Sequence, residues 1–158
     1  MIKKLIVMLG LFLCLIPLKV SAADEVPADI QELAEEVGEE FNICPELLEA
    51  IAYKESRFDE SVQSGNYYGL MQVNVRVHSK RIRDMGYKSK DMFEARPCMR
   101  VAAAYLHDLF NQYEEADLVL ACYSGSLNTY LKYGYSGYGD YVLGLSWEYE
   151  EEHGKHNY

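Results

Sequence analysis

Apolar residues recur every three or four positions through most of the chain, the spacing that places them on one face of a helix. The pattern predicts six helices, near residues 30–41, 45–55, 76–84, 97–113, 116–123 and 141–149. Pro27, Pro45 and Pro97 stand where three of them begin, a position at which the missing proline N–H costs no hydrogen bond. Strand-like alternation and internal repeats are absent from the sequence, so we expect a single, mainly α domain.

One acidic residue lies on an apolar helix face. Leu48, Ile51, Ala52 and Glu55 follow the helical spacing, and the helix ends just before a polar, glycine-containing loop at 58–74. Apolar surroundings disfavour the charged form of a carboxyl group, so such a group stays protonated near neutral pH, as a general acid requires. The competing interpretation is that Glu55 points to solvent from a frayed helix end.

The N-terminal segment has the pattern of a secretory signal peptide. Two lysines precede an apolar run from Leu5 to Leu18, and small residues follow. The run is about 14 residues long, short of the ~20 needed to span a bilayer, and bulky residues before Cys14 argue against lipid attachment. We expect a protein secreted to the extracellular or periplasmic cell-wall space, without a stable membrane anchor after cleavage. The predicted boundaries are a signal peptide at 1–22, a domain at 23–150 and a polar tail at 151–158.

The net charge of −10 argues against a nucleic-acid-binding protein. Loss of the signal-peptide lysines would make the charge about −13, whereas nucleic-acid-binding domains are basic. Acidic residues gather at 24–60 and basic residues at 76–100. The basic segment could meet an anionic polymer such as a cell wall, or it could pair with the acidic half of the same domain.

The cysteines and histidines do not indicate a metal site or a cofactor. Three cysteines follow the signal peptide, so at most one internal disulfide can form among them. Cys44 and Cys98 each adjoin a proline at an expected helix start, and this pair is favoured if a disulfide forms. Cys122 lies in an apolar helix, which is typical of a small buried residue rather than a nucleophile. The four histidines lack zinc-ligand spacing.

Four blocks of sequence together resemble the catalytic region of lytic transglycosylases of the lysozyme superfamily. In chain order they are Glu55-Ser56 with Phe58, then Ser64 with Gly69-Leu70-Met71-Gln72, then Ala121-Cys122-Tyr123-Ser124-Gly125-Ser126, and last Gly139-Asp140-Tyr141-Val142. The resemblance extends over roughly residues 30–150. It implies a mainly α, lysozyme-like single domain of about six helices, with an irregular loop or minimal β-hairpin at the active-site cleft.

The resemblance also implies a role for individual residues. Glu55 matches the catalytic acid/base, and Gln72 matches a glutamine whose amide hydrogen-bonds substrate or orients the carboxyl group. Ser64 matches a loop serine near the sugar N-acetyl group. Tyr123 and Tyr141 match cleft tyrosines, which can offer a ring face to a sugar and a hydroxyl to the acid.

The sequence departs from the family pattern at Ser124, where an asparagine is usual. A hydroxyl has fewer donors and a shorter reach than an amide, so this change bears on affinity or subsite preference. The segment before the long helix, 93–98, also departs from the usual motif and places Cys98 at the helix start.

The implied reaction uses one carboxylate. Glu55 protonates the β-1,4 oxygen between N-acetylmuramic acid and N-acetylglucosamine, then deprotonates the muramyl C6 hydroxyl, which closes a 1,6-anhydro ring. Asp59 and Glu60, the nearest other acids, match no family position, whereas most glycosidases need two carboxylates. The expected partner is therefore a peptidoglycan strand bound by a monomer. The alternatives are a hydrolytic lysozyme and a lysozyme-like module that binds peptidoglycan without cutting it.

Overall fold

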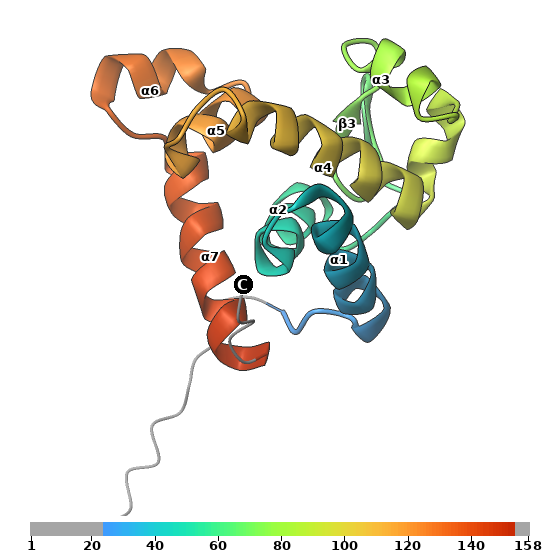
Figure 1. Ribbon diagram of the computed structural model, residues 1–158, viewed down its shortest axis with the longest axis horizontal. Helices are drawn as coiled ribbons and strands as arrows, with labels where there is room; N and C mark the ends of the chain where they lie inside the picture. Colours follow the sequence, from blue (N-terminus) through green and yellow to red (C-terminus); the bar gives the residue numbers. More distant parts are fainter. Residues whose placement is uncertain (1–23, 154–158) are drawn as a thin grey trace, which may run out of the picture.

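The computed structural model describes residues 24–153, which form one mainly helical domain with a small sheet (Figure 1). The elements are α1 (Ala28–Phe41), α2 (Pro45–Ser56), β1 (Gln63–Ser64), β2 (Tyr67–Tyr68), β3 (Val73–Asn74), α3 (Ser79–Asp84), the 3-10 helix η1 (Ser89–Phe93), α4 (Ala95–Phe110), α5 (Ala116–Tyr123), α6 (Leu127–Tyr133) and α7 (Gly137–His153). The predicted mainly α, lysozyme-like fold is confirmed. The predicted signal peptide and the last five residues of the predicted tail lie outside the described residues, and 151–153 continue α7. Between residues 24 and 153, no helix is both long and apolar enough to cross a membrane.

Helix α2 is the centre of the domain. It packs against α1 on one side and α7 on the other (Figure 1), and ten of its twelve residues are buried. Leu48, Ile51 and Ala52 are fully enclosed, as the apolar face of the sequence predicts. The helix is followed by its cap residue Arg57, which takes a left-handed conformation with φ of 55°. Because α2 is buried over most of its length, packing in the core fixes the position of its last turn, which carries Glu55.

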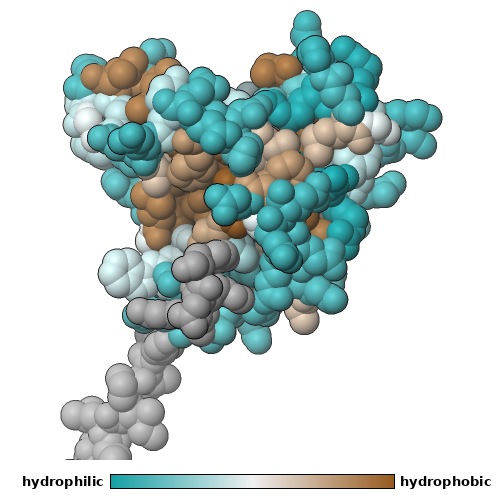
Figure 2. Space-filling view, viewed as in Figure 1, coloured by the Kyte–Doolittle hydropathy of each residue, from teal (hydrophilic) through white to brown (hydrophobic). Residues whose placement is uncertain are grey.

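The basic residues of α4 pair with the acidic residues of α1. Arg96 Nη1 lies 2.6 Å from Glu36 Oε2, and Arg100 binds both carboxylate oxygens of Glu40. Of the two interpretations of the basic segment, internal pairing is the one that these contacts show. Such exposed pairs contribute little stability individually; they link α1 to α4 at the protein surface. Figure 2 shows the surface over α1 as mostly hydrophilic.

The structure adds two elements that the apolar pattern does not reveal. The predicted loop at 58–74 carries a three-stranded antiparallel sheet in the order β1-β2-β3, with Ser64 opposite Tyr67 and Tyr67 opposite Asn74. Strands of two residues are too short to show an alternating pattern. Helix α6 lies in a segment predicted to be a loop, and none of its residues is buried. A helix without a buried face leaves no apolar period in the sequence.

Two carboxyl groups of α2 are buried in the core at the opposite end from Glu55. Glu46 and Glu49 are each only 1% exposed, and the Cys44 thiol donates to Glu46 Oε2 at 3.0 Å. Glu49 Oε2 lies 3.4 Å from Nδ1 of His153, the last residue of α7. Burial, with the nearby charges of Glu46 and Glu35, raises the pKa of Glu49 to about 8. The folded state therefore keeps a proton here that the unfolded chain, with a carboxyl pKa near 4.5, releases at lower pH.

We predict that the free energy of unfolding falls as pH rises from about 5 to about 8, because in that window the folded state binds more protons than the unfolded state. Glu49→Gln removes this slope, since the amide has a similar shape and no charge to bury. Urea unfolding at a series of pH values measures the effect, and Glu39→Gln, at an exposed position of α1, is the control. Equal slopes for the wild type and Glu49→Gln would contradict the assignment.

Candidate active site

A pocket of about 240 Å³ opens where the C-terminal end of α2 meets the small sheet. Its walls come from β2 and β3, the residues before α3, the middle of α4 and the end of α5, so the α3 and α5 sides of the molecule in Figure 1 both contribute. Three predicted site residues line it together, Glu55, Gln72 and Tyr123. Ser64 and Tyr141, also predicted from the sequence, do not line this pocket.

Glu55 lies in the last turn of α2 and is half-buried. Burial raises the pKa of its carboxyl group above 4.5, and a hydrogen bond from Tyr138 and the charge of Lys54 oppose part of that increase. Tyr138 Oη donates to Glu55 Oε1 at 2.7 Å. The surroundings thus favour a protonated carboxyl group while keeping a donor ready for its charged form, which suits a group that gives up and takes back a proton.

The tyrosine that reaches the acid is Tyr138 and not Tyr141. Tyr141 lies one turn later on α7, is 41% exposed, and has Lys54 Nζ 4.6 Å from its ring centroid. Helix α7 begins at Gly137 rather than near 141, so its first turn carries Tyr138 over the end of α2. The spacing of tyrosines in the sequence gives no signal for which of them faces α2.

Gln72 takes a left-handed conformation, with φ of 46°, which is uncommon for a residue other than glycine. Its amide nitrogen donates to the carbonyl oxygens of Val62 at 3.1 Å and Gly69 at 2.9 Å. Because an amide nitrogen has two hydrogens, both are used within the loop. The side-chain oxygen is therefore the atom that can accept a hydrogen bond from a bound sugar.

Tyr123 joins the end of α5 to the same loop. Its hydroxyl donates to the carbonyl oxygen of Met71 at 3.0 Å, and its ring stacks on Tyr105 with centroids 5.9 Å apart. The neighbouring Ser124 keeps its hydroxyl within its own turn, 2.8 Å from the Ser126 hydroxyl. Tyr123 and Ser124 both line the pocket. The ring of Tyr123 thus lies at the pocket wall while its hydroxyl holds the loop that carries Gln72.

Among the pocket-wall residues that the sequence prediction does not include, four have polar side chains: Tyr67, Asn74, His78 and Tyr105. Tyr67 and Asn74 are partners across β2 and β3, so recognising the sheet would have placed them together. His78 and Tyr105 contact each other, with ring centroids 4.6 Å apart, although 27 positions separate them along the chain. No local pattern signals that contact.

The two acids that follow Glu55 in the sequence have structural roles. Asp59 accepts hydrogen bonds from the backbone N–H and the hydroxyl of Ser61, at 2.8 and 2.6 Å. Glu60 Oε2 accepts from the backbone N–H of Ala95, the first residue of α4, at 2.9 Å, where a negative charge is favourable. Neither lines the pocket. Within residues 24–153, no group of three or more His, Cys, Asp or Glu side chains is arranged to hold a metal ion.

Cys98 contacts the backbone around the Gly-Leu-Met-Gln turn through its sulfur and forms no disulfide. Its sulfur accepts from the backbone N–H of Met71 at 3.4 Å and donates to the carbonyl oxygen of Tyr68 at 3.5 Å. The three cysteines of residues 24–153 are free, so the disulfide between Cys44 and Cys98, which the sequence left open, does not form. The physical reason is that Cys98 faces the loop, whereas Cys44 faces Glu46.

A mainly α domain with a small antiparallel sheet and one half-buried glutamate at the end of a central helix is the arrangement of lysozyme-like glycan-cleaving enzymes. Residues 32–140 match the transglycosylase SLT domain, and the chain belongs to that family.

Two curated relatives are the proteins named Protein IpgF of Shigella flexneri, 43% identical over 86 residues, and of Shigella sonnei, 42% identical over 86 residues. Each alignment covers 50% of this chain and 55% of the relative. The chain thus spans about half the length of the curated relatives that it matches.

We predict that Gly69→Ala is far more destabilising than Gly65→Ala. Both glycines have positive φ, 72° and 60°, so alanine costs about 1–2 kcal/mol at either position. A Cβ at Gly69 would also lie 1.8 Å from the Met92 carbonyl oxygen, whereas nothing lies within 4 Å of one at Gly65. This clash adds at least ~2 kcal/mol. Urea unfolding of the two variants measures the difference, and equal losses would show that the turn does not pack against η1 as described.

Proposed function

We propose that the chain is a secreted peptidoglycan lytic transglycosylase that cleaves the β-1,4 bond between N-acetylmuramic acid and N-acetylglucosamine. The products carry a 1,6-anhydromuramyl end, and Glu55 is the sole acid/base. The observation that carries this proposal is that Glu55 is the only carboxylate lining the pocket formed by residues 24–153. Glycosidases that add water through the usual route place a second carboxylate within about 5–9.5 Å of the first.

The first step is proton transfer to the bridging oxygen. Protonated Glu55 gives its proton to that oxygen as the bond to muramyl C1 breaks, and N-acetylglucosamine leaves with a free hydroxyl group. The charge that develops on Glu55 is stabilised by the hydroxyl of Tyr138, which already donates to Oε1. Because Oε1 holds that bond, Oε2 is the oxygen that carries the transferable proton.

The second step closes the ring. The Glu55 carboxylate takes the proton from the muramyl C6 hydroxyl, the C6 oxygen bonds to C1, and the acid returns to its protonated form. No water is consumed, so the proton balance closes on Glu55 alone. The substrate's own acetamido group can stabilise the positive charge at C1, which accounts for a route without a second carboxylate.

The remaining predicted residues bind the sugars. Gln72 and Tyr123 line the pocket, and in this proposal the Gln72 side-chain oxygen and the Tyr123 ring contact the bound sugar. Ser64 and Tyr141 do not line the pocket, and we assign them to sugars bound outside it. Ser124 lines the pocket where the family has asparagine, and its short hydroxyl bears on affinity rather than on proton transfer. The enzyme acts as a monomer on peptidoglycan outside the cytoplasm.

Product analysis separates this reaction from the two alternatives. We predict that digestion of purified sacculi releases muropeptides with 1,6-anhydro ends, about 18 Da lighter than hydrolysis products because no water is added. Glu55→Gln keeps the shape of the side chain without its proton and lowers the rate at least ~10²-fold. Mass spectrometry of the soluble fraction measures both.

Gln112→Glu, at an exposed residue just after α4, is the control. It adds a carboxylate away from the pocket and leaves the rate unchanged. Reducing muramic ends would assign the chain to the hydrolytic lysozymes. Sacculus binding without soluble products would assign it to the non-cleaving modules.

A further inference from the structure

The first turn of α7, which carries Tyr138, is tied to α5 by a buried side-chain contact. Ser136, the residue directly before α7, is fully enclosed, and its hydroxyl donates to Asp117 Oδ1 at 3.1 Å. The same hydroxyl oxygen accepts from the backbone N–H of Gly139 at 2.9 Å. Ser136 therefore caps the helix and at the same time joins it to a carboxylate of the neighbouring α5.

A glycine lets the two helices approach this closely. A Cβ at Gly139 would lie 1.7 Å from Asp117 Oδ1, whereas nothing lies within 4 Å of one at Gly137. Both glycines belong to the first turn of α7, so the contact with α5 has room for a side chain at only one of them. The sequence block Gly139-Asp140-Tyr141-Val142 thus begins with a glycine whose missing side chain makes room for the α5 carboxylate.

Tyr138 lies between the two anchored residues, Ser136 and Gly139. Its hydroxyl donates to Glu55 Oε1 at 2.7 Å. Because O–H···O hydrogen bonds rarely exceed about 3.0 Å, a displacement of α7 by about 1 Å is enough to break this one. Burial, with the nearby Tyr123 and Glu55, raises the pKa of Tyr138, so its hydroxyl keeps the proton that it donates. The bond to the acid therefore depends on where α7 begins.

Helix α5 holds both the loop and the helix that meet at the site. Asp117 is in its first turn and Tyr123 is its last residue. Tyr123 binds the carbonyl oxygen of Met71 in the loop, and Asp117 binds the start of α7. Asp117 and Ser136 do not line the pocket. Their effect on a bound sugar must therefore pass through other residues.

We propose that Asp117 and Ser136 are positioning residues for the proton transfer, because together they fix the first turn of α7 and so hold the Tyr138 hydroxyl on Glu55. They act through Tyr138 and touch no substrate. When Glu55 gives its proton to the bridging oxygen, the hydroxyl held in this way stabilises the carboxylate that forms. This inference rests on the proposed function for the role of Glu55, and it adds two residues outside the pocket on which the strength of the acid depends.

The test is a ¹³C NMR titration of the Glu55 side-chain carboxyl in the full chain without substrate. Ser136→Ala and Asp117→Ala raise the pKa of Glu55, because each loosens the donor that stabilises the charged form. In a Tyr138→Phe background the same two changes have no further effect, since the hydroxyl is already gone. An unchanged Glu55 pKa in the single variants, or an equal shift in both backgrounds, would overturn the proposal. A role confined to stability gives the first of these results.

A conservative change separates the hydrogen bond from the charge. Asp117→Asn keeps an oxygen that can accept from the Ser136 hydroxyl, so we expect it to leave the pKa of Glu55 near the wild-type value. A shift as large as that of Asp117→Ala would contradict the assigned hydrogen bond. Asp117 is half-buried at the start of α5, so its variants decide the question if Ser136→Ala does not fold.

The two glycines of the first turn give a matched pair of variants. Gly139→Ala pushes the Asp117 carboxylate away from α7 and raises the pKa of Glu55, whereas Gly137→Ala meets no atom within 4 Å and leaves it unchanged. Equal effects of the two changes would show that the close approach of α5 does not place the donor.

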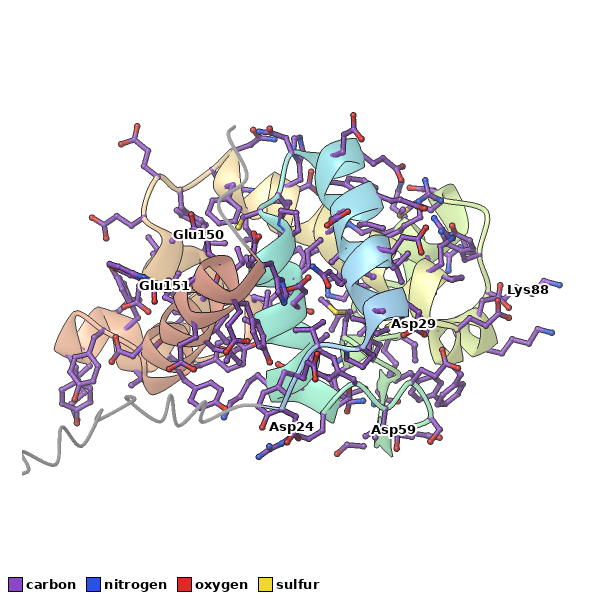
Figure 3. The ribbon with its side chains drawn as sticks, turned by 90° about the horizontal axis from the view of Figure 1, so that it is seen from below. Asp24, Asp29, Asp59, Lys88, Glu150 and Glu151 are labelled. Atoms are coloured by element: carbon purple, nitrogen blue, oxygen red, sulfur yellow. The ribbon has the colours of Figure 1, made fainter. Side chains whose placement is uncertain are left out.

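Two other carboxylates serve as controls for charge. Glu115, directly before α5, accepts a hydrogen bond from Tyr130 of α6. Glu151, near the C-terminal end of α7 (Figure 3), accepts from an indole N–H four residues earlier on the same helix. We expect Glu115→Gln and Glu151→Gln to leave the pKa of Glu55 unchanged. A shift equal to that of Asp117→Ala in either one would contradict a specific contact with the start of α7.

Kinetics on soluble glycan strands separate this proposal from the proposed function. We expect Ser136→Ala and Asp117→Ala to lower kcat about fivefold and to leave KM within about twofold, because they weaken proton transfer and not sugar binding. A change in KM alone would overturn the positioning role and leave the transglycosylase intact. Absence of cleavage by the wild type would overturn the proposed function, and the titration of Glu55 would still decide the positioning role.

Discussion

The hydrogen bond from Tyr138 to Glu55 joins the two helices on which the site depends. Helix α2 carries the acid and α7 carries the donor, and the two helices pack against each other. At the other end of that interface Glu49 faces His153. The acid is thus placed by the core, not by a loop, and its desolvation follows from the packing of α2 between α1 and α7.

The residues just beyond α2 turn the chain sharply so that the loop can return over the acid. Arg57 and Phe58 both have positive φ, 55° and 64°, as does Gln72 at the far end of the loop. Left-handed residues other than glycine are unfavourable, and here they are held by surrounding contacts. Ser56 donates to the Leu70 carbonyl oxygen at 2.8 Å, and Cys98 contacts the backbone of the same turn. These hydrogen bonds therefore hold the loop against the end of α2 and the start of α4.

The sequence was sufficient for features that are local along the chain. The apolar period located α2 and put Glu55 on its buried face, and the motif from Glu55 to Gln72 located the loop. It was insufficient where a contact joins distant segments. Tyr138 rather than Tyr141 reaches Glu55 because α7 starts at Gly137, and that start is set by packing on α2 and α5. Cys98 lies under the loop for the same kind of reason, which no spacing of cysteines could indicate.

The central claim is that Glu55 is an acid whose pKa is raised by burial and held in check by Tyr138. Titration of the Glu55 side-chain carboxyl by ¹³C NMR, in the wild type and in Tyr138→Phe, tests it most directly. The account predicts a pKa above 4.5 in the wild type and a higher one in Tyr138→Phe, because the variant loses the hydrogen bond that stabilises the charged form. A wild-type pKa at or below 4.5, or a lower pKa in the variant, would contradict it.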